Sequence, residues 1–311
     1  MIKKIFHIII AFSFATFSAV LKIASRLFRL FTSSKVDVEE TQIDTSIKIS
    51  RYEKLYIHSK VLDKEMRINV YLPNDYGNGE HYHVLYIFHG LDAIEDAWIP
   101  YMGLERTADD LTDDKKIKPL IIVSPEIDNS FGINSYPFYM HVKIDNQELD
   151  MGMYEDYICK ELIPFIDKEF STISDRSGRY IGGFSMGGFI ALHTSFLHTD
   201  MFSRVGGHSP ALWSDNNLID YAMKLLYPTR QLREERDPIF IAQTKQDLNK
   251  LSIYLDCGDE DEYMLYKGSA ELYNILKTKG VNVSYLKNVG KHDFIYWMSH
   301  IKEYLLFYAG V

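Results

Sequence analysis

The chain has 311 residues, 46% of them hydrophobic and 25% charged, which excludes a disordered, a collagen-like or a multi-span membrane protein. Its two cysteines, Cys159 and Cys257, are too few for a disulfide framework or a cysteine-rich zinc site. The net charge of −9 is uneven: residues 1–35 carry six basic and no acidic side chains, whereas residues 36–311 carry 28 basic and 43 acidic ones, a balance that repels nucleic acid and excludes it as a partner.

The first 35 residues have the pattern of a signal peptide or a membrane anchor. Lys3 and Lys4 precede a run of 17 residues without a charge (5–21), which is at the short end of what can span a membrane. A basic amphipathic stretch follows. We therefore expect an N-terminal hydrophobic helix, membrane contact through residues 5–31, and a protein that is membrane-associated or exported. The basic residues before and after the run favour opposite orientations, so they do not decide on which side of the membrane the body lies. A cytoplasmic protein is the alternative.

Residues 36–52 are expected to form a linker, and residues 53–311 a single catalytic domain of the α/β class. Because short apolar runs alternate with amphipathic stretches from residue 84 on, we expect a mostly parallel central sheet with helices on both faces. Residues 126–153 are expected to form a long functional loop. The expected strands are 54–58, 66–72, 84–88, 120–123, 179–183, 203–208, 251–256 and 281–286, and the expected helices are 104–111, 154–169, 187–198, 216–226, 239–248, 264–279 and 294–308.

A glycine-rich motif lies between an expected strand and an expected helix. Residues 183–187 have the sequence G-F-S-M-G. This context predicts a nucleophile elbow, a tight turn from strand to helix that raises a serine above the edge of the sheet. Glycines two residues before and two residues after the serine leave room for such a turn. We therefore expect Ser185 to be a catalytic nucleophile.

A serine hydroxyl is a weak nucleophile that needs a base, and the base needs an acid to orient it. In a fold with this elbow, both partners follow the serine in the chain, the acid first. His292 lies between the last expected strand and the last expected helix, where a loop can reach back to the serine. The acidic loop 256–262 supplies the acid. Asp261 is our choice, because Gly258 allows the chain to bend just before it, and Asp259 is the alternative.

Two backbone N–H groups are needed to stabilise the oxyanion of a tetrahedral intermediate. We expect one from Met186, the residue after the nucleophile, and the other from Leu91, in the loop after the strand at 84–88. Gly90 in that loop permits a close approach of the backbone to the substrate. His89 has no second ligand at a helical or turn spacing, so we expect no metal site there.

Four aromatic residues are candidates for the wall of a substrate pocket. They are Trp98, Tyr136, Phe138 and Tyr139. The last three belong to the long loop at 126–153. Packing of these rings beneath the loop, without any role in binding, is the alternative.

Together these motifs resemble the esterase D and feruloyl-esterase-like family of α/β-hydrolases. The resemblance runs from about residue 53 to residue 308, and it implies Ser185, Asp261 and His292 as the catalytic triad, with Leu91 and Met186 as the oxyanion donors. It rests on F-H-G-L at 88–91 with Trp98 downstream, Y-E-D-Y at 154–157 leading to E-L-I-P at 161–164, G-F-S-M-G-G at 183–188, D-C-G-D-E-D at 256–261 and G-K-H-D-F at 290–294.

The resemblance also implies an activity. It favours a serine carboxylic ester hydrolase that acts on short-chain acyl, sugar or aryl esters through an acyl-enzyme intermediate, with a small-molecule ester as its partner and with no cofactor and no metal. Mycolyltransferases belong to the same family, so transfer of an acyl group to a sugar or lipid hydroxyl is the alternative. A non-catalytic binding protein on this fold is a third hypothesis, against which the complete set of triad residues argues.

Overall fold

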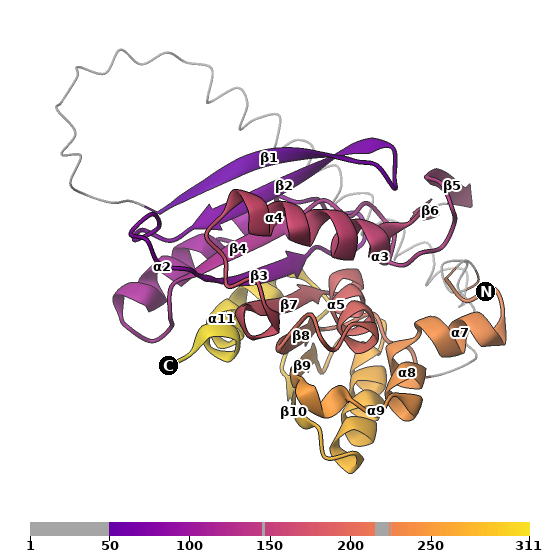
Figure 1. The fold of residues 1–311 in the computed structure, drawn as a ribbon. Helices are drawn as coiled ribbons and strands as arrows, with labels where there is room; N and C mark the ends of the chain where they lie inside the picture. Colours follow the sequence, from indigo (N-terminus) through magenta and orange to yellow (C-terminus); the bar gives the residue numbers. More distant parts are fainter. Residues whose placement is uncertain (1–49, 145–146, 215–223, 225) are drawn as a thin grey trace. The chain divides into compact units, whose positions relative to one another are not determined.

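The computed structural model describes residues 50–144, 147–214, 224 and 226–311 (Figure 1). The expected leader, nearly all of the expected linker and most of the helix expected at 216–226 lie outside the described residues. Within the described ranges, no helix combines the length and the hydropathy that crossing a membrane requires.

The described residues form a central sheet of eight strands in the order β1-β2-β4-β3-β7-β8-β9-β10. Strand β2 is antiparallel to both of its neighbours, and all pairs from β4 to β10 are parallel. The mostly parallel sheet predicted from the alternation of elements is therefore confirmed. The strands are β1 (Arg51–Ser59), β2 (Lys64–Leu72), β3 (His83–Phe88), β4 (Leu120–Pro125), β7 (Arg179–Phe184), β8 (Arg204–His208), β9 (Ser252–Gly258) and β10 (Asn282–Asn288).

Helices cover both faces of the sheet and enclose one apolar core on each side (Figure 1). The core of one face is closed by α4 (Ile163–Glu169), α5 (Met186–Leu197), α8 (Pro238–Thr244) and α9 (Leu265–Thr278). The core of the other face is closed by α2 (Leu104–Asp113), α10 (Phe294–Ser299) and α11 (Ile301–Ala309). Shorter helical segments lie at Ala97–Tyr101, α3 (Tyr154–Asp156), Tyr157–Leu162, Arg176–Gly178 and Leu248–Lys250.

Three elements differ from the sequence-based expectation. The segment expected as a long loop contains an antiparallel hairpin, β5 (Met140–Ile144) and β6 (Gln147–Met151). A short helix, α7 (Arg230–Arg236), was not expected, because most of its side chains are charged and none of its residues is buried. The single helix expected at 294–308 is broken at His300 into α10 and α11.

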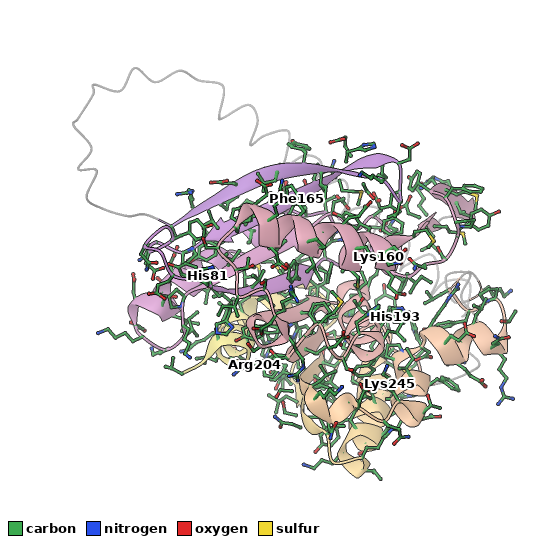
Figure 2. All side chains as sticks on the ribbon, in the orientation of Figure 1. His81, Lys160, Phe165, His193, Arg204 and Lys245 are labelled. Atoms are coloured by element: carbon green, nitrogen blue, oxygen red, sulfur yellow. The ribbon has the colours of Figure 1, made fainter. Side chains whose placement is uncertain are left out.

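The C-terminal helix is fastened to the middle of the sheet. A Cβ atom at Gly182 or at Gly206 would lie 1.8 or 1.9 Å from the hydroxyl of Tyr308, so these two neighbouring strand positions leave the space that the hydroxyl fills. Arg204, at the start of β8, lies beside the yellow C-terminal helix (Figure 2). Its Nη1 donates hydrogen bonds to the carbonyl oxygens of Phe307 and Tyr308, at 2.5 and 2.8 Å. Helix α11 is thus fixed to β7, the strand that leads into the elbow, and to its neighbour β8.

Candidate active site

Ser185 lies at the sharp turn between β7 and α5. Its backbone has φ 55° and ψ −117°, a conformation that is strained for a residue with a side chain. The turn brings chains so close together that a Cβ at Gly183 would lie 2.5 Å from the backbone carbon of Gly187, and a Cβ at Gly187 would lie 2.2 Å from the carbonyl oxygen of Phe88. The two glycines of the motif are therefore needed for steric reasons, as expected for a nucleophile elbow.

The structure brings Ser185, His292 and Asp261 into one hydrogen-bonded chain. The Nε2 atom of His292 lies 2.9 Å from Oγ of Ser185, and its Nδ1 atom lies 2.8 Å from Oδ2 of Asp261. The histidine comes from the loop between β10 and α10, and the aspartate from the loop after β9. Three segments that are distant in sequence therefore meet at the carboxyl edge of the sheet, where open α/β sheets bind their ligands.

Asp261 is held in place and kept ionised by its surroundings. It is 3% exposed, and its Oδ1 accepts hydrogen bonds from the backbone N–H groups of Tyr263 and Leu265, at 2.9 and 3.4 Å. Burial alone would raise the pKa of Asp261, but the hydrogen bond and the charge interaction with His292 outweigh burial and lower that pKa. The carboxylate is therefore suited to orient the imidazole and to stabilise its charged form.

Asp259, the alternative acid, has a different place in the same loop. Its Oδ1 accepts a hydrogen bond from the backbone N–H of Gly290, at 3.1 Å. Its own N–H donates to the carbonyl oxygen of Asn288, at 2.8 Å. Asp259 therefore braces the loop that carries His292, while Asp261 is the carboxylate that touches the imidazole.

The two expected oxyanion donors belong to the elbow and to the loop that packs against it. Met186 is the first residue of α5, and an N–H at the first position of a helix has no acceptor within that helix. The loop after β3 runs beside the elbow, since a Cβ at Gly90 would lie 3.3 Å from Cβ of Ser185 and 2.5 Å from the ring of Phe184. Leu91 follows directly. The role of the two N–H groups as oxyanion donors stays a prediction.

A group of buried charged side chains lies beneath this loop. His89, Glu95 and Glu126 are each at most 5% exposed. Arg67 pairs with both glutamates, with Nε 2.9 Å from Oε1 of Glu95 and Nη2 2.6 Å from Oε2 of Glu126. Lys54 adds a second cation, with Nζ 2.8 Å from Oε1 of Glu95. Sequence reasoning singled out only His89, because isolated charged residues next to apolar strands carry no motif.

The four aromatic candidates for a substrate wall fall into two groups. Trp98 is 0% exposed, donates a hydrogen bond from Nε1 to the carbonyl oxygen of Phe88 at 2.9 Å, and packs edge-on against Phe184. Its prediction as part of the wall is wrong, because it is a core residue behind the elbow. Tyr136, Phe138 and Tyr139 are partly exposed, between 36% and 58%, and their role stays a prediction.

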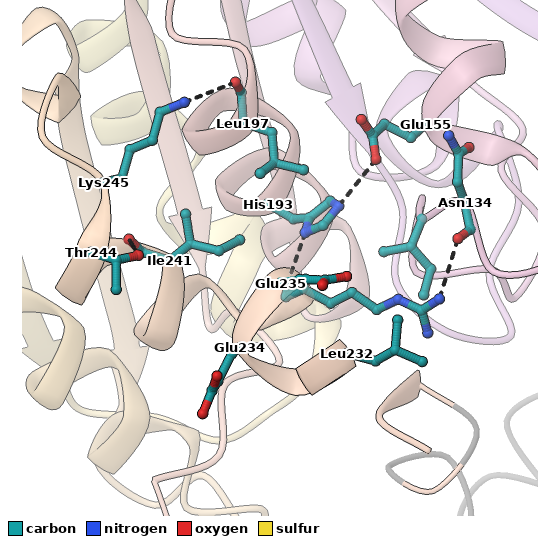
Figure 3. Close-up of a pocket in the computed structure, with 12 residues that line it drawn as sticks. Asn134, Glu155, His193, Leu197, Leu232, Glu234, Glu235, Ile241, Thr244 and Lys245 are labelled. Atoms are coloured by element: carbon teal, nitrogen blue, oxygen red, sulfur yellow. Dashed lines mark hydrogen bonds and ion pairs between the residues drawn. The ribbon is translucent and has the colours of Figure 1, made fainter. Parts of the chain in front are cut away.

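Figure 3 shows a cavity of about 470 Å³ that Ser185 does not line. His193, on α5, lines it, and the helical rise of 1.5 Å per residue puts this position about 10 Å from Met186. Asn134, Glu155, Leu232, Arg236 and Lys245 also line it. In the part of the chain that the structure describes, no cluster of His, Cys, Asp and Glu side chains is arranged to hold a metal ion.

Comparison with known proteins agrees with this geometry. A family model described as "Putative esterase" matches residues 59–308. Among curated proteins, an endo-1,4-beta-xylanase/feruloyl esterase of Xylanibacter ruminicola is 29% identical over 247 residues, which are 77% of this chain and 28% of that protein. The chain thus spans well under half of this relative's length.

Solved structures share the fold. A ferulic acid esterase is 26% identical, with a TM-score of 0.69, over 83% of this chain and 96% of that one. An S-formylglutathione hydrolase from Staphylococcus aureus is 21% identical, with a TM-score of 0.63, over 83% of this chain and 98% of that one. Since the family model covers most of the chain, including the elbow and the loops that bear Asp261 and His292, the chain belongs to the esterase family and is an enzyme with the α/β-hydrolase fold.

Proposed function

We propose that this enzyme is a serine carboxylic ester hydrolase for short-chain acyl, sugar or aryl esters, and that it works through an acyl-enzyme intermediate. The single observation that carries the proposal is the continuous chain from Ser185 Oγ through the His292 imidazole to the Asp261 carboxylate, with hydrogen-bond distances of 2.9 and 2.8 Å. The names of the related feruloyl esterases support an ester as the substrate class.

In the first half of the reaction, Oγ of Ser185 attacks the ester carbonyl carbon while Nε2 of His292 takes the hydroxyl proton. The carbonyl oxygen becomes an oxyanion that the N–H groups of Leu91 and Met186 stabilise. Asp261 holds Nδ1–H of His292 and stabilises the imidazolium. When the intermediate collapses, His292 gives its proton to the leaving alcohol, and the acyl group stays on Ser185 as an ester.

In the second half, His292 takes a proton from a water molecule, which attacks the acyl-enzyme. The new tetrahedral intermediate collapses, His292 returns the proton to Ser185 Oγ, and the free acid leaves. An alcohol in place of water would give acyl transfer to a sugar or lipid hydroxyl, the alternative that shares every residue of the site.

The test is turnover of a panel of aryl esters with acyl chains from acetate to octanoate, together with feruloyl and acetyl-sugar esters. We expect release of free acid by the wild type and loss of activity in Ser185→Ala. Turnover of no ester by the folded protein, or full activity in Ser185→Ala, would refute the proposal. Addition of a sugar or a long-chain alcohol separates the two outcomes, because a transferase would form the new ester in preference to the free acid.

We further propose that residues 1–35 bring this enzyme to a membrane or export it. The uncharged run at 5–21 between basic residues supports this. Expression of the full chain and of residues 36–311, followed by cell fractionation, tests it: membrane or extracellular recovery of the full chain alone is expected. Recovery of both forms in the cytoplasmic fraction would contradict the proposal.

A further inference from the structure

Tyr296, in the first turn of α10, lies under the loop that carries His292. Its hydroxyl accepts a hydrogen bond from Nδ2 of Asn288, at 3.2 Å, on the incoming side of that loop. Its ring packs so closely on the loop that a Cβ at Gly290 would lie 2.5 Å from Cδ2 of Tyr296. The phenol thus touches the loop at two points just before the histidine.

The same hydroxyl is anchored in the interior of the protein. It donates a hydrogen bond to Oδ2 of Asp256, at 2.7 Å, and Asp256, within β9, is 0% exposed. Asp256 also accepts from Oη of Tyr304, at 2.9 Å, and lies 2.9 Å from Nδ1 of His208. Burial and the Asp256 carboxylate raise the pKa of Tyr296, so the phenol stays protonated and remains a donor.

The residues around the Asp256 carboxylate also hold the backbone of the nucleophile. The carbonyl oxygen of His208 accepts the backbone N–H of Ser185, at 2.9 Å, and the carbonyl oxygen of Asp256 accepts that of Ser209, at 2.8 Å. The neighbouring Trp297 stacks on Phe184 with ring centroids 4.2 Å apart, and lies edge-on to His292 at 5.0 Å. Tyr296 is therefore one of the side chains that tie the loop of the base to the strands that hold the nucleophile, and it alone among them bridges Asn288 to the buried Asp256.

We propose that Tyr296 is a positioning residue that fixes the His292 loop, and thereby the imidazole between Ser185 and Asp261, by bridging Asn288 to the buried carboxylate of Asp256. The inference rests on the proposed ester hydrolysis by these three residues. It predicts that removal of the Tyr296 hydroxyl lowers the rate of the chemical steps, because small misplacements of a catalytic group are costly.

Tyr304 provides a matched control. Its hydroxyl, on α11, donates to the same oxygen of Asp256 at 2.9 Å, while that of Tyr296 donates at 2.7 Å. Tyr304→Phe and Tyr296→Phe therefore each remove one hydrogen bond from that carboxylate. Only Tyr296→Phe also removes the bond to Asn288 on the loop. A difference between the two variants therefore reports on the loop and not on the buried carboxylate.

The first measurement is steady-state kinetics with the best ester, together with the thermal midpoint of both variants. We expect Tyr296→Phe to lose roughly 10- to 100-fold in kcat with KM changed by no more than about twofold. We expect Tyr304→Phe to retain kcat within about threefold at a similar loss of stability. Equal losses of kcat in the two variants, or an unchanged kcat in Tyr296→Phe, would overturn the inference.

The second measurement does not need turnover. The proton that His292 Nδ1 donates to Asp261 is expected to give a downfield proton NMR resonance, assigned by its loss in His292→Ala. We expect this signal to be broadened or lost in Tyr296→Phe and kept in Tyr304→Phe. If the wild type hydrolyses no ester, the proposed function fails, while the resonance still decides whether Tyr296 positions the imidazole. A resonance unchanged in Tyr296→Phe would refute the positioning role.

Discussion

The Nε2 atom of His89 lies 3.1 Å from Oε1 of Glu126 in a site closed to solvent. The two residues directly follow the neighbouring parallel strands β3 and β4. Nδ1 of His89 also lies 2.9 Å from the carbonyl oxygen of Gly90. Burial alone would lower the pKa of His89, but the hydrogen bond and the charge of Glu126 outweigh burial and raise it. This contact joins the loop after β3 to the end of β4.

We expect His89→Leu to loosen this loop. Glu126 keeps Arg67 as a partner, so the cost in the free energy of unfolding should be about 1–3 kcal/mol. Since the proposed oxyanion donor Leu91 lies in this loop, kcat should fall by up to roughly 10²-fold. Urea unfolding and ester hydrolysis measure the two effects. His58→Leu, an exposed histidine paired with Glu65, is the control and should change neither. A stable variant with wild-type kcat would show that the contact between His89 and Glu126 does not position the loop.

Substitution of the two candidate acids should lower kcat to very different extents. Asp261→Asn should lower kcat by roughly 10⁴-fold, because an amide cannot hold the required tautomer of His292 or stabilise its charged form. Asp259→Asn should keep kcat within about tenfold, since Asp259 contacts the backbone of the histidine loop and not the imidazole. Both variants are measured with the same aryl ester. A greater loss in Asp259→Asn would reverse the assignment.

Glu155 should make stability sensitive to acid. It lies 2.8 Å from Nε2 of His198 and 3.5 Å from Nε2 of His193 (Figure 3 shows the latter pair). Burial alone would raise the pKa of Glu155, but the two histidines outweigh burial and lower that pKa to about 2. Because the pKa of Glu155 is lower in the folded than in the unfolded state, its ionised carboxylate stabilises the fold. This stabilisation is complete above pH 4.5 and is lost as the pH falls from 4.5 to 2.

Glu155→Gln should therefore lower the free energy of unfolding at pH 6 by on the order of 1–2 kcal/mol, and the difference from the wild type should vanish near pH 2. Urea unfolding at a series of pH values measures it. Glu235→Gln, on the same cavity, is the control and should follow the wild type at every pH. A difference that does not depend on pH would show that Glu155 acts by packing and not by charge.

Gly187→Ala should break the elbow. The added Cβ would lie 2.2 Å from a backbone oxygen that cannot move without distorting β3. We expect destabilisation of several kcal/mol, on the order of 3–5, and loss of labelling of Ser185 by a fluorophosphonate probe. Gly280→Ala is the control: it has φ +70° but open space around its Cβ, so it should cost only about 1–2 kcal/mol and leave labelling intact. Intact labelling in Gly187→Ala would contradict this account of the motif.

The parts of the site that sequence could predict are those with a local steric or topological signature. The glycines around Ser185 and the position of His292 between the last strand and the last helix both have one. Asp256 and Tyr296 have none, because an aspartate within a strand and a tyrosine in a helix acquire their partners only when β9 and α10 meet. Trp98 shows the same limit, since an aromatic ring near a motif suits a core as well as a pocket.

The same reasoning explains the elements that were missed. The strands β5 and β6 have five residues each and alternate too briefly for a period of two to be distinguished from a loop. The helix α7 has no buried residue, so it lacks the apolar stripe by which amphipathic helices are recognised. By contrast, the apolar runs of β3 and β4 predicted their strands to within two residues, since both strands are buried on both faces.

The space shared by Gly182, Gly206 and Tyr308 also bears on how this sequence can change over evolution. The tyrosine hydroxyl stands where two Cβ atoms would otherwise be, so a methyl group gained in either strand requires a smaller residue on the helix. The loss of that hydroxyl would leave Nε2 of His208, 3.2 Å away, without this hydrogen-bond partner. These positions are therefore expected to covary among relatives, so that an exchange in a central strand is accompanied by one in the last helix, more than 100 residues later.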